Sequence, residues 1–200
     1  MNNQSLRILL AEDEAMVLFG FKMFLNEMGH SVVGEAYDGE MAINLARQHT
    51  PDLLIMDVRM PVMDGIRALE IINSQSDTII PCIFVTAYSD LELIEKAKEA
   101  GAFNYLIKPI SFDSLRAAIE IAMVRFKEYK NVHKELVVTK NNLENRKFIE
   151  KAKGILMEEF NFREQQAMEY MQKKSRNSNK KLVEVAKEII RMNEALALGK

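Results

Sequence analysis

The chain has 200 residues, of which 48% are hydrophobic and 28% are charged. This composition is typical of one large or two small globular domains and excludes a disordered or fibrous chain. Its single cysteine, Cys82, excludes an internal disulfide, and no apolar run reaches the roughly 18–20 residues that cross a bilayer. Because the first residues also lack the apolar core of a signal peptide, we expect a cytoplasmic protein without a membrane partner.

Charge is distributed unevenly along the chain. Residues 1–124 hold 9 Lys and Arg against 18 Asp and Glu, a net charge of −9, whereas residues 125–200 hold 18 against 11, a net charge of +7. The two values sum to the −2 of the whole chain. This asymmetry favours two domains with different partners, and the basic half indicates a nucleic acid or an anionic surface. Basic helices that serve only solubility would give the same composition.

The first half alternates short apolar runs with amphipathic helical patterns. Runs typical of buried strands cover 6–11, 31–36, 53–57, 79–86 and 103–107. Helical patterns cover 15–28, 39–48, 64–74, 90–99 and the chain from 112 onward. Asp38 is a candidate cap of the second helix, and Ser89 or Asp90 of the fourth. Five such units predict an α/β fold with a five-stranded, doubly wound parallel sheet of flavodoxin-like order 2-1-3-4-5.

Carboxylates follow two strands that this order makes neighbours. Glu12 and Asp13 end the first apolar run, and Asp57 ends the third. Like charges this close oppose one another unless a cation is present, and a hard divalent cation bound by oxygens is the natural resolution. The pattern therefore predicts a Mg²⁺ site, with the Arg59 backbone carbonyl as a further ligand and Asp57 as a possible phosphoryl acceptor.

Two more polar residues follow strands at the same edge. Thr86 offers a hydroxyl at the end of the fourth apolar run, and Lys108 offers a point cation after the fifth. Pro109 would fix the loop so that the lysine points inward, and the sequence leaves open whether its peptide bond is cis. A lone carboxylate at position 57 would be read as a capping or solvated group, but the full set favours a reactive site.

These motifs together carry a family resemblance. The acidic pair, the D-x-x-M-P-x-M-D-G stretch from Asp57 to Gly65, Thr86-Ala87 and Lys108-Pro109 occur in order at strand ends. Residues 5–122 thus resemble the receiver domain of two-component response regulators, which implies a first domain over about 1–122. The resemblance implies these roles: phosphoacceptor for Asp57, metal ligands for Glu12 and Asp13, phosphate contacts for Thr86 and Lys108, and an aromatic switch for Tyr105. An ordinary half-buried aromatic residue of a strand explains Tyr105 equally well. Many members of the family have aspartate where this chain has Glu12, so Glu12 would bind the metal either directly or through a bridging water.

A long helical pattern follows Pro109, the last proline of the chain. Alternating spacings of four and three residues predict a heptad seam in a helical linker over 112–143, continuous with the last helix of the first domain. The seam positions are Leu115, Ile119, Ala122, Phe126, Tyr129, His133, Leu136, Lys140 and Leu143. Because His133 and Lys140 interrupt it, we expect a seam that is short or only conditionally paired.

The basic half predicts a three-helix bundle over 136–200, with shorter helices at about 163–174 and from Leu182, separated by a polar turn at 175–179. The stretch 152–157 (AKGILM) and the stretch 179–186 (NKKLVEVA) together resemble an ANTAR domain, the RNA-binding module of transcription antitermination regulators. We expect RNA contacts at Arg146, Lys147, Lys151, Lys153, Arg176, Asn177, Asn179, Lys180 and Lys181. Gly154 would allow either close helix packing, which we favour, or close approach of RNA.

The sequence thus predicts a response regulator that a sensor histidine kinase phosphorylates on Asp57. Phosphorylation would favour a homodimer that binds RNA hairpin loops and prevents termination of transcription. We expect no enzyme activity beyond Mg²⁺-dependent phosphorylation and dephosphorylation of the protein itself. One alternative is a DNA-binding helix-turn-helix output, although the polar turn lacks the usual glycine. Others are an adaptor that only dimerises through 112–143, and a phosphatase, for which a second nucleophile or acid beside Asp57 is missing.

Overall fold

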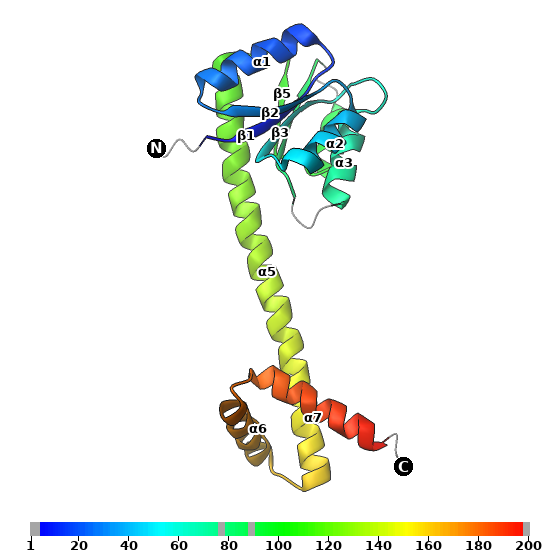
Figure 1. The fold of residues 1–200 in the computed structure, drawn as a ribbon, viewed down its shortest axis with the longest axis vertical. Coiled ribbons are helices and arrows are strands. Elements are labelled where there is room, and N and C mark those ends of the chain that lie inside the picture. The colour runs from blue at the N-terminus through cyan, green and yellow to red at the C-terminus, as the bar shows by residue number, and fades with distance from the viewer. Residues whose placement is uncertain (1–4, 76–78, 88–90, 198–200) are drawn as a thin grey trace. The chain divides into compact units, whose positions relative to one another are not determined.

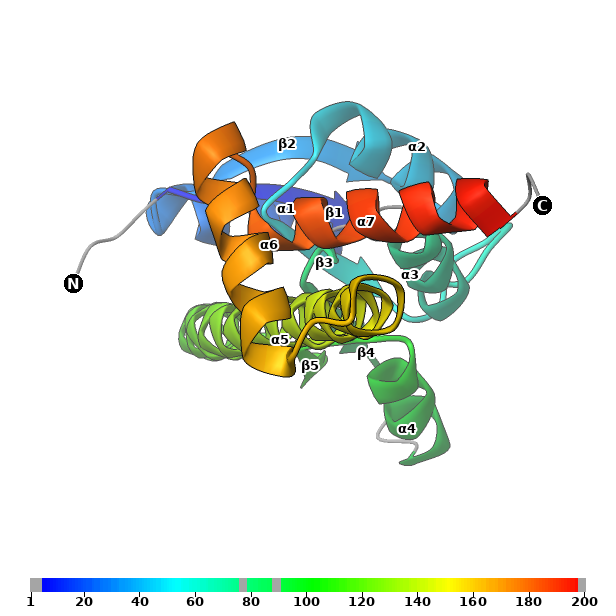
Figure 2. The ribbon, with the colours of Figure 1, turned by 90° about the horizontal axis from the view of Figure 1, so that it is seen from below.

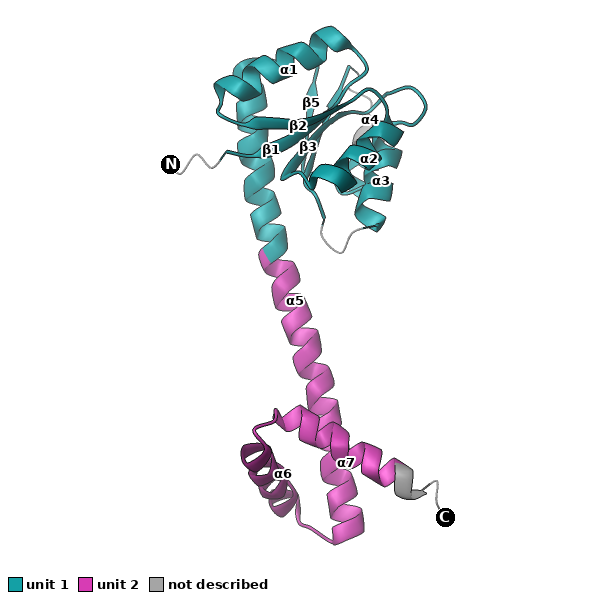
Figure 3. Cartoon of the chain, viewed as in Figure 1, with its two compact units in different colours: residues 1–130 teal, residues 131–200 magenta. Residues whose placement is uncertain are grey.

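The computed structural model of the protein describes residues 5–75, 79–87 and 91–197. The chain divides into two compact units, residues 1–130 and residues 131–200, which we call the N-terminal unit and the C-terminal unit (Figure 3). Among the described residues, none of the helices combines the length and the apolarity needed to cross a membrane.

The N-terminal unit is built on one parallel sheet. Its strands are β1 (Arg7–Ala11), β2 (Ser31–Ala36), β3 (Leu53–Asp57), β4 (Cys82–Thr86) and β5 (Asn104–Ile107). They lie in the order β2-β1-β3-β4-β5, which confirms the predicted flavodoxin-like topology. Every residue of β3 and β4 is buried, because central strands of a parallel sheet are covered on both faces.

Helices cover both faces of the sheet. They are α1 (Ala15–Glu27), α2 (Gly39–His49), α3 (Gly65–Ser74), α4 (Leu91–Glu99) and the start of α5 (Phe112–Phe160). Side chains of α1 and α5 share one apolar core with the sheet, and side chains of α2, α3 and α4 share a second core on the other face (Figure 1). Cys82 lies in the second core, where burial raises the pKa of its thiol and keeps it unreactive.

Carboxylate caps fix where two of these helices begin. Asp38 accepts a hydrogen bond from the backbone N–H of Met41 at 2.7 Å, which confirms the predicted cap of α2. Asp64 accepts one from the backbone N–H of Arg67 at 2.8 Å at the start of α3. The predicted caps Ser89 and Asp90 lie outside the described residues.

The predicted seam begins inside the core of the N-terminal unit. Leu115, Ile119 and Ala122 are at most 4% exposed and pack with α1 against the sheet. These three side chains are therefore buried in the core of their own chain. The prediction that they form part of a seam between two chains is wrong for these positions. A coiled-coil seam and a helix that packs on a sheet place apolar residues at similar spacings, so the sequence pattern could not distinguish the two.

Further along α5 the seam becomes exposed. The rings of Phe126 and Tyr129 meet the ring of Phe103 edge to face, with centroids 5.5 and 5.9 Å apart. The remaining seam positions are exposed: His133, Leu136, Lys140 and Leu143. The helix continues beyond the seam without a break to Phe160.

The C-terminal unit consists of α5 from Asn131 onward with α6 (Glu164–Ser178) and α7 (Leu182–Ala197). Figures 1 and 2 show both shorter helices against the end of α5. The shared core is formed by Ala152, Leu156, Ala167, Met171, Val185, Ala186, Ile189 and Ile190. This arrangement confirms that further helices follow the long one, as predicted.

Two details of this unit differ from the prediction. The turn expected at 175–179 is wrong, because α6 continues to Ser178 and Asn179 ends it in a left-handed conformation with φ 51°. Ser178 donates from its hydroxyl to the Lys174 carbonyl at 2.8 Å, so a polar side chain is satisfied inside the helix. Close packing at Gly154 is also wrong, since a Cβ placed there would meet no atom within 4 Å.

Candidate functional site

The carboxyl ends of β1 and β3 bring three carboxylates together, which we call the acidic rim: Glu12, Asp13 and Asp57. The two strands are parallel neighbours with Ala11 opposite Met56, so the residues that follow them meet at one edge. One carboxylate oxygen from each of the three lies within 4.8 Å of the others. Glu12 and Asp57 are buried, and Asp13 is exposed.

A tight turn after β3 holds Asp57 in place. Its Oδ1 atom accepts a hydrogen bond from the backbone N–H of Arg59 at 2.9 Å. The backbone N–H of Gly65 donates to the Val58 carbonyl at 2.9 Å, which closes the loop. A Cβ on Gly65 would lie 2.1 Å from the Asp57 carbonyl oxygen, so this position requires glycine. The conspicuous glycine of the motif therefore serves the close approach of two backbone segments.

Lys108 is the cation of the rim. Its Nζ atom donates to Asp57 Oδ2 at 2.6 Å and to Glu12 Oε1 at 2.8 Å, and lies 3.5 Å from Glu14 Oε1. Burial alone would lower the pKa of this lysine, but the hydrogen bonds with Asp57 and Glu12 outweigh it and raise the pKa. The Lys108-Pro109 peptide bond is cis, which answers the question left open by the sequence.

Glu12 has the chemistry of a metal ligand. Burial raises the pKa of its carboxyl, the hydrogen bond from Lys108 opposes this, and the charge of Asp57 adds to the rise. Its second oxygen, Oε2, is buried and has no hydrogen-bond partner in the part of the chain that the structure describes. A buried carboxylate oxygen without a partner is unfavourable, and a divalent cation among three such carboxylates would satisfy it. The residues present therefore fit a Mg²⁺ ion.

The other predicted residues of this site lie at neighbouring strand ends. Thr86 is the last residue of β4 and is 4% exposed. Its backbone carbonyl accepts a hydrogen bond of 2.8 Å from the backbone N–H of Lys108. Tyr105 lies in β5 opposite Phe84 and is 41% exposed, so its ring is on the surface of the unit in this structure. A metal-ligand role of the Arg59 carbonyl stays a prediction.

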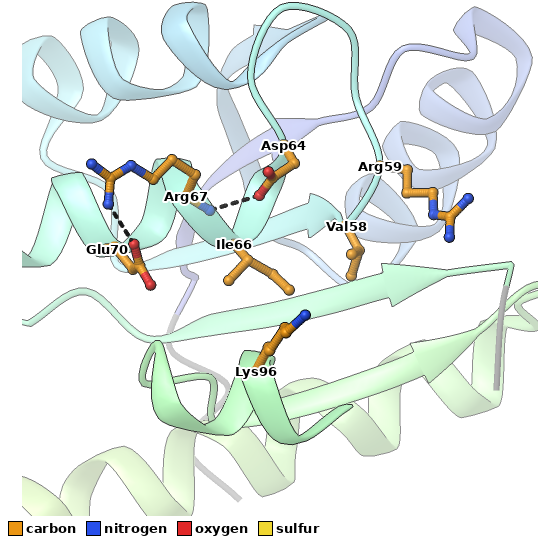
Figure 4. Close-up of a pocket in the computed structure, with 7 residues that line it drawn as sticks. All are labelled: Val58, Arg59, Asp64, Ile66, Arg67, Glu70 and Lys96. Atoms are coloured by element: carbon orange, nitrogen blue, oxygen red, sulfur yellow. Dashed lines mark hydrogen bonds and ion pairs between the residues drawn. The ribbon is translucent and has the colours of Figure 1, made fainter. Parts of the chain in front are cut away.

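A cavity of about 390 Å³ lies between α3, α4 and the loop after Asp57. Figure 4 shows Lys96 extending from α4 toward Val58 and Ile66, while Arg67 pairs with Glu70 at 2.8 Å. The lining residues are Val58, Arg59, Asp64, Ile66, Arg67, Glu70 and Lys96, and none of them belongs to the acidic rim. The cavity thus borders the candidate site at Arg59, whose carbonyl is a predicted metal ligand, but it includes none of the three carboxylates.

In the C-terminal unit, three of the lysines expected to contact RNA have carboxylate partners. Lys153 is 9% exposed, and its Nζ atom lies 2.8 Å from Glu164 and 2.9 Å from Glu150. These contacts raise the pKa of Lys153, Glu164 first. Lys153 thus links α5 to Glu164 at the start of α6, and this structural role argues against the prediction that it contacts RNA.

The other two pairs are more open. Lys151 lies 3.0 Å from Glu194, and both side chains are more than half exposed. Lys180 forms an ion pair with Glu188, with the two side chains 47% and 32% exposed. The remaining predicted contacts are exposed: Arg146, Lys147, Arg176, Asn177, Asn179 and Lys181.

The sequence reasoning missed these carboxylate partners. Glu150 precedes Lys153 by three residues, a helical spacing that the sequence displays and that indicates an ion pair. Glu164 and Glu194 meet their lysines only through helix packing, so no local pattern could have revealed those two contacts. Glu188 instead lies in the helix that Lys180 directly precedes, eight residues further along the chain.

Known proteins resemble the chain over both units. Residues 8–120 match the model of the response regulator receiver domain, and residues 138–190 match that of the ANTAR domain. The transcriptional regulatory protein PdtaR of Mycobacterium tuberculosis is 41% identical over 187 residues, which cover 92% of this chain and 90% of that protein.

Solved structures resemble the chain over a smaller part. The signal receiver domain of a modulated diguanylate cyclase from Desulfovibrio desulfuricans G20 is 28% identical with a TM-score of 0.57, covering 63% of this chain and 99% of that one. A two-component response regulator of the LuxR family from Aurantimonas sp. SI85-9A1 is 33% identical with a TM-score of 0.55, covering 58% and 84%.

Proposed function

The chain belongs to the response regulators, with a receiver domain followed by an ANTAR domain, and we propose that a sensor histidine kinase phosphorylates it on Asp57 to control RNA binding and antitermination. The observation that carries the proposal is the pairing of Asp57 with Lys108 at 2.6 Å inside a cluster of carboxylates. The ANTAR match and the net charge of +7 over residues 125–200 support RNA as the partner.

At the rim, Asp57 acts as the nucleophile. Its Oδ2 atom attacks the phosphorus of the kinase's phosphohistidine, a P–O bond forms, and the P–N bond to the histidine breaks. Glu12, Asp13, Asp57 and the Arg59 carbonyl would hold Mg²⁺, which when bound would supply positive charge to balance the phosphoryl oxygens. Because Lys108 Nζ already lies 2.6 Å from Oδ2, it moves to a phosphoryl oxygen with little rearrangement. The chemistry is confined to the protein's own aspartate.

Phosphorylation is relayed by residues next to the rim. The Thr86 hydroxyl donates to the phosphoryl group, and the exposed Tyr105 ring moves inward into the space vacated beside it. This changes the surface formed by α4, β5 and the start of α5. Since α5 also supplies Ala152 and Leu156 to the core of the C-terminal unit, one continuous helix belongs to both domains.

Dimerisation is the step that would connect this change to RNA. The exposed seam positions of α5, Leu136 and Leu143, are 63% and 58% exposed and offer an apolar surface to a second copy. Two C-terminal units would then bind paired RNA hairpins and prevent a terminator from forming. A DNA-binding output is the second candidate, but in the described residues the turn between α6 and α7 has an asparagine rather than a glycine at its left-handed position.

The experiment compares a short RNA hairpin with duplex DNA of equal length at several salt concentrations. We expect preferential RNA binding that strengthens when acetyl phosphate is added. It should be lost when Arg176, Lys180 and Lys181 are all changed to Ala. Asp57→Asn should form no acyl phosphate and should not respond to acetyl phosphate. Equal or tighter binding of duplex DNA, or labelling retained by Asp57→Asn, would contradict the proposal.

A further inference from the structure

Cations from the end of α6 and from α7 act on one carboxylate of α7, Glu188, and we call this group the cation cluster. Glu188 on α7 pairs with Lys180, which precedes that helix. The same carboxylate lies in the positive field of Lys174 on α6 and of Arg191, one turn further along α7. Only Lys180 of this group was among the expected RNA contacts.

The position of Lys180 is fixed by the backbone around it. Ser175 donates from its hydroxyl to the Lys180 carbonyl at 2.6 Å, and the Lys180 backbone N–H donates to the Ser175 carbonyl at 3.1 Å. Asn179 provides the left-handed residue that reverses the chain. These bonds fix the backbone of Lys180 just before α7, and from there its side chain reaches Glu188.

The charges in this cluster do not balance. Glu188 contacts Lys180, and the charges of Lys174 and Arg191 also act on it. The pKa of Glu188 is lowered mainly by the hydrogen bond from Lys180. A second carboxylate, Glu184, lies near Lys180, but its Oε2 atom accepts the backbone N–H of Lys181 at 3.0 Å at the start of α7. The cluster therefore keeps a net positive charge with Glu188 in place, and gains one more unit without it.

We propose that Glu188 is an internal counter-ion that occupies the place of an RNA backbone phosphate, so that Lys174, Lys180 and Arg191 form a phosphate site from which Glu188 is displaced on binding. The inference rests on the proposed RNA binding and deepens it. An acidic side chain at such a site weakens binding to every RNA equally, because phosphates carry no sequence information. Glu188 thus suppresses non-specific binding, and base contacts from the neighbouring turn decide which hairpin is bound.

Glu194 provides a matched control on the same helix. It pairs with Lys151 at 3.0 Å, and Glu194→Gln changes the net charge by the same amount as Glu188→Gln. At the Lys151 pair, however, one carboxylate faces one lysine. The two variants therefore separate an effect of this particular cluster from a general effect of charge.

The experiment measures binding of the full chain to a short RNA hairpin and to the same RNA with a scrambled loop, over a range of salt. Glu188→Gln should bind both RNAs about fivefold more tightly at 0.1 M salt, and log K against log salt should steepen by about 0.7, as one added phosphate contact predicts. Glu194→Gln releases Lys151 alone, so it should tighten binding of both RNAs by less than twofold. Lys174→Gln and Arg191→Gln should each weaken both RNAs and flatten the slope.

The outcomes separate the two proposals. Wild-type protein that binds RNA, with Glu188→Gln and Glu194→Gln behaving alike, overturns the counter-ion role and leaves the proposed function intact. Wild-type protein that binds no RNA overturns both. Tighter binding of duplex DNA but not of RNA by Glu188→Gln assigns the cluster to DNA and also refutes the inference. Circular dichroism of each variant checks that the helices are retained.

Discussion

Two glycines of this protein occupy opposite environments, although both lie in helices. Gly65 begins α3, where an added Cβ would lie 2.1 Å from the Asp57 carbonyl oxygen. Gly154 lies inside α5, where an added Cβ would meet no atom within 4 Å. The first glycine is required because the end of β3 approaches it closely, and the second makes the interior of α5 less stable than alanine would.

Alanine substitutions should therefore have opposite effects. Gly65→Ala should lower the free energy of unfolding by about 1–3 kcal/mol, because backbone must move, and should impair phosphorylation. Gly154→Ala should raise it by up to about 1 kcal/mol, because alanine restricts the unfolded chain and favours helix. Urea unfolding followed by circular dichroism measures both. Two variants of equal stability would contradict this account of Gly65, and weaker RNA binding by Gly154→Ala would show that RNA approaches the backbone there.

At the scale of the element, α5 changes its environment along its length. Its first turns are part of the core of the N-terminal unit, and its last turns are part of the core of the C-terminal unit. Between them the apolar side chains are exposed, with Val132, Leu136 and Leu143 all 58–63% exposed. Exposed apolar residues at helical spacing in an otherwise charged segment favour contact with another molecule, and a second copy of α5 has the matching pattern.

Charged substitutions in this middle segment should prevent self-association without affecting the fold. Leu136→Glu combined with Leu143→Glu should remain monomeric in the presence of beryllofluoride, whereas the wild-type chain should dimerise. Because both leucines are exposed, the melting temperature of the monomer should stay within a few degrees. Sedimentation velocity measures the association. A wild-type chain that stays monomeric with beryllofluoride and RNA present would exclude dimerisation. As a contrast, Ile119→Glu should unfold the N-terminal unit, because Ile119 is buried in its core.

At the scale of the molecule, the acidic and basic halves coincide closely with the two units. The carboxylates of the N-terminal unit include the rim, where Glu12 is 1% exposed and has one oxygen without a partner among the described residues. A ligand that binds only the folded state stabilises it in proportion to the logarithm of its concentration. Mg²⁺ should therefore stabilise one unit and leave the other unchanged.

Calorimetry with and without Mg²⁺ tests this expectation. At a Mg²⁺ concentration ten times its dissociation constant, the N-terminal unit should gain about 1.4 kcal/mol, and unfolding of the C-terminal unit should not shift. Asp13→Asn is the suitable control, because Asp13 is exposed and its loss should remove the metal effect with little change in the fold. An equal stabilisation of both units, or a Mg²⁺ effect that survives in Asp13→Asn, would refute the assignment of the rim as the metal site.

Patterns along the chain were enough to predict the sheet order, the convergence of Glu12, Asp13, Asp57 and Lys108 at one edge, and the presence of helices after Pro109. These features follow from local periodicity and from motifs at strand ends, both of which involve residues that are close together in the sequence. Tertiary structure decided which residues of α5 are buried, that Lys153 is enclosed by Glu150 and Glu164, and that Glu188 lies among cations. The contact of Lys153 with Glu164 joins two different helices, so it depends on how the helices pack and leaves no periodic trace in the sequence.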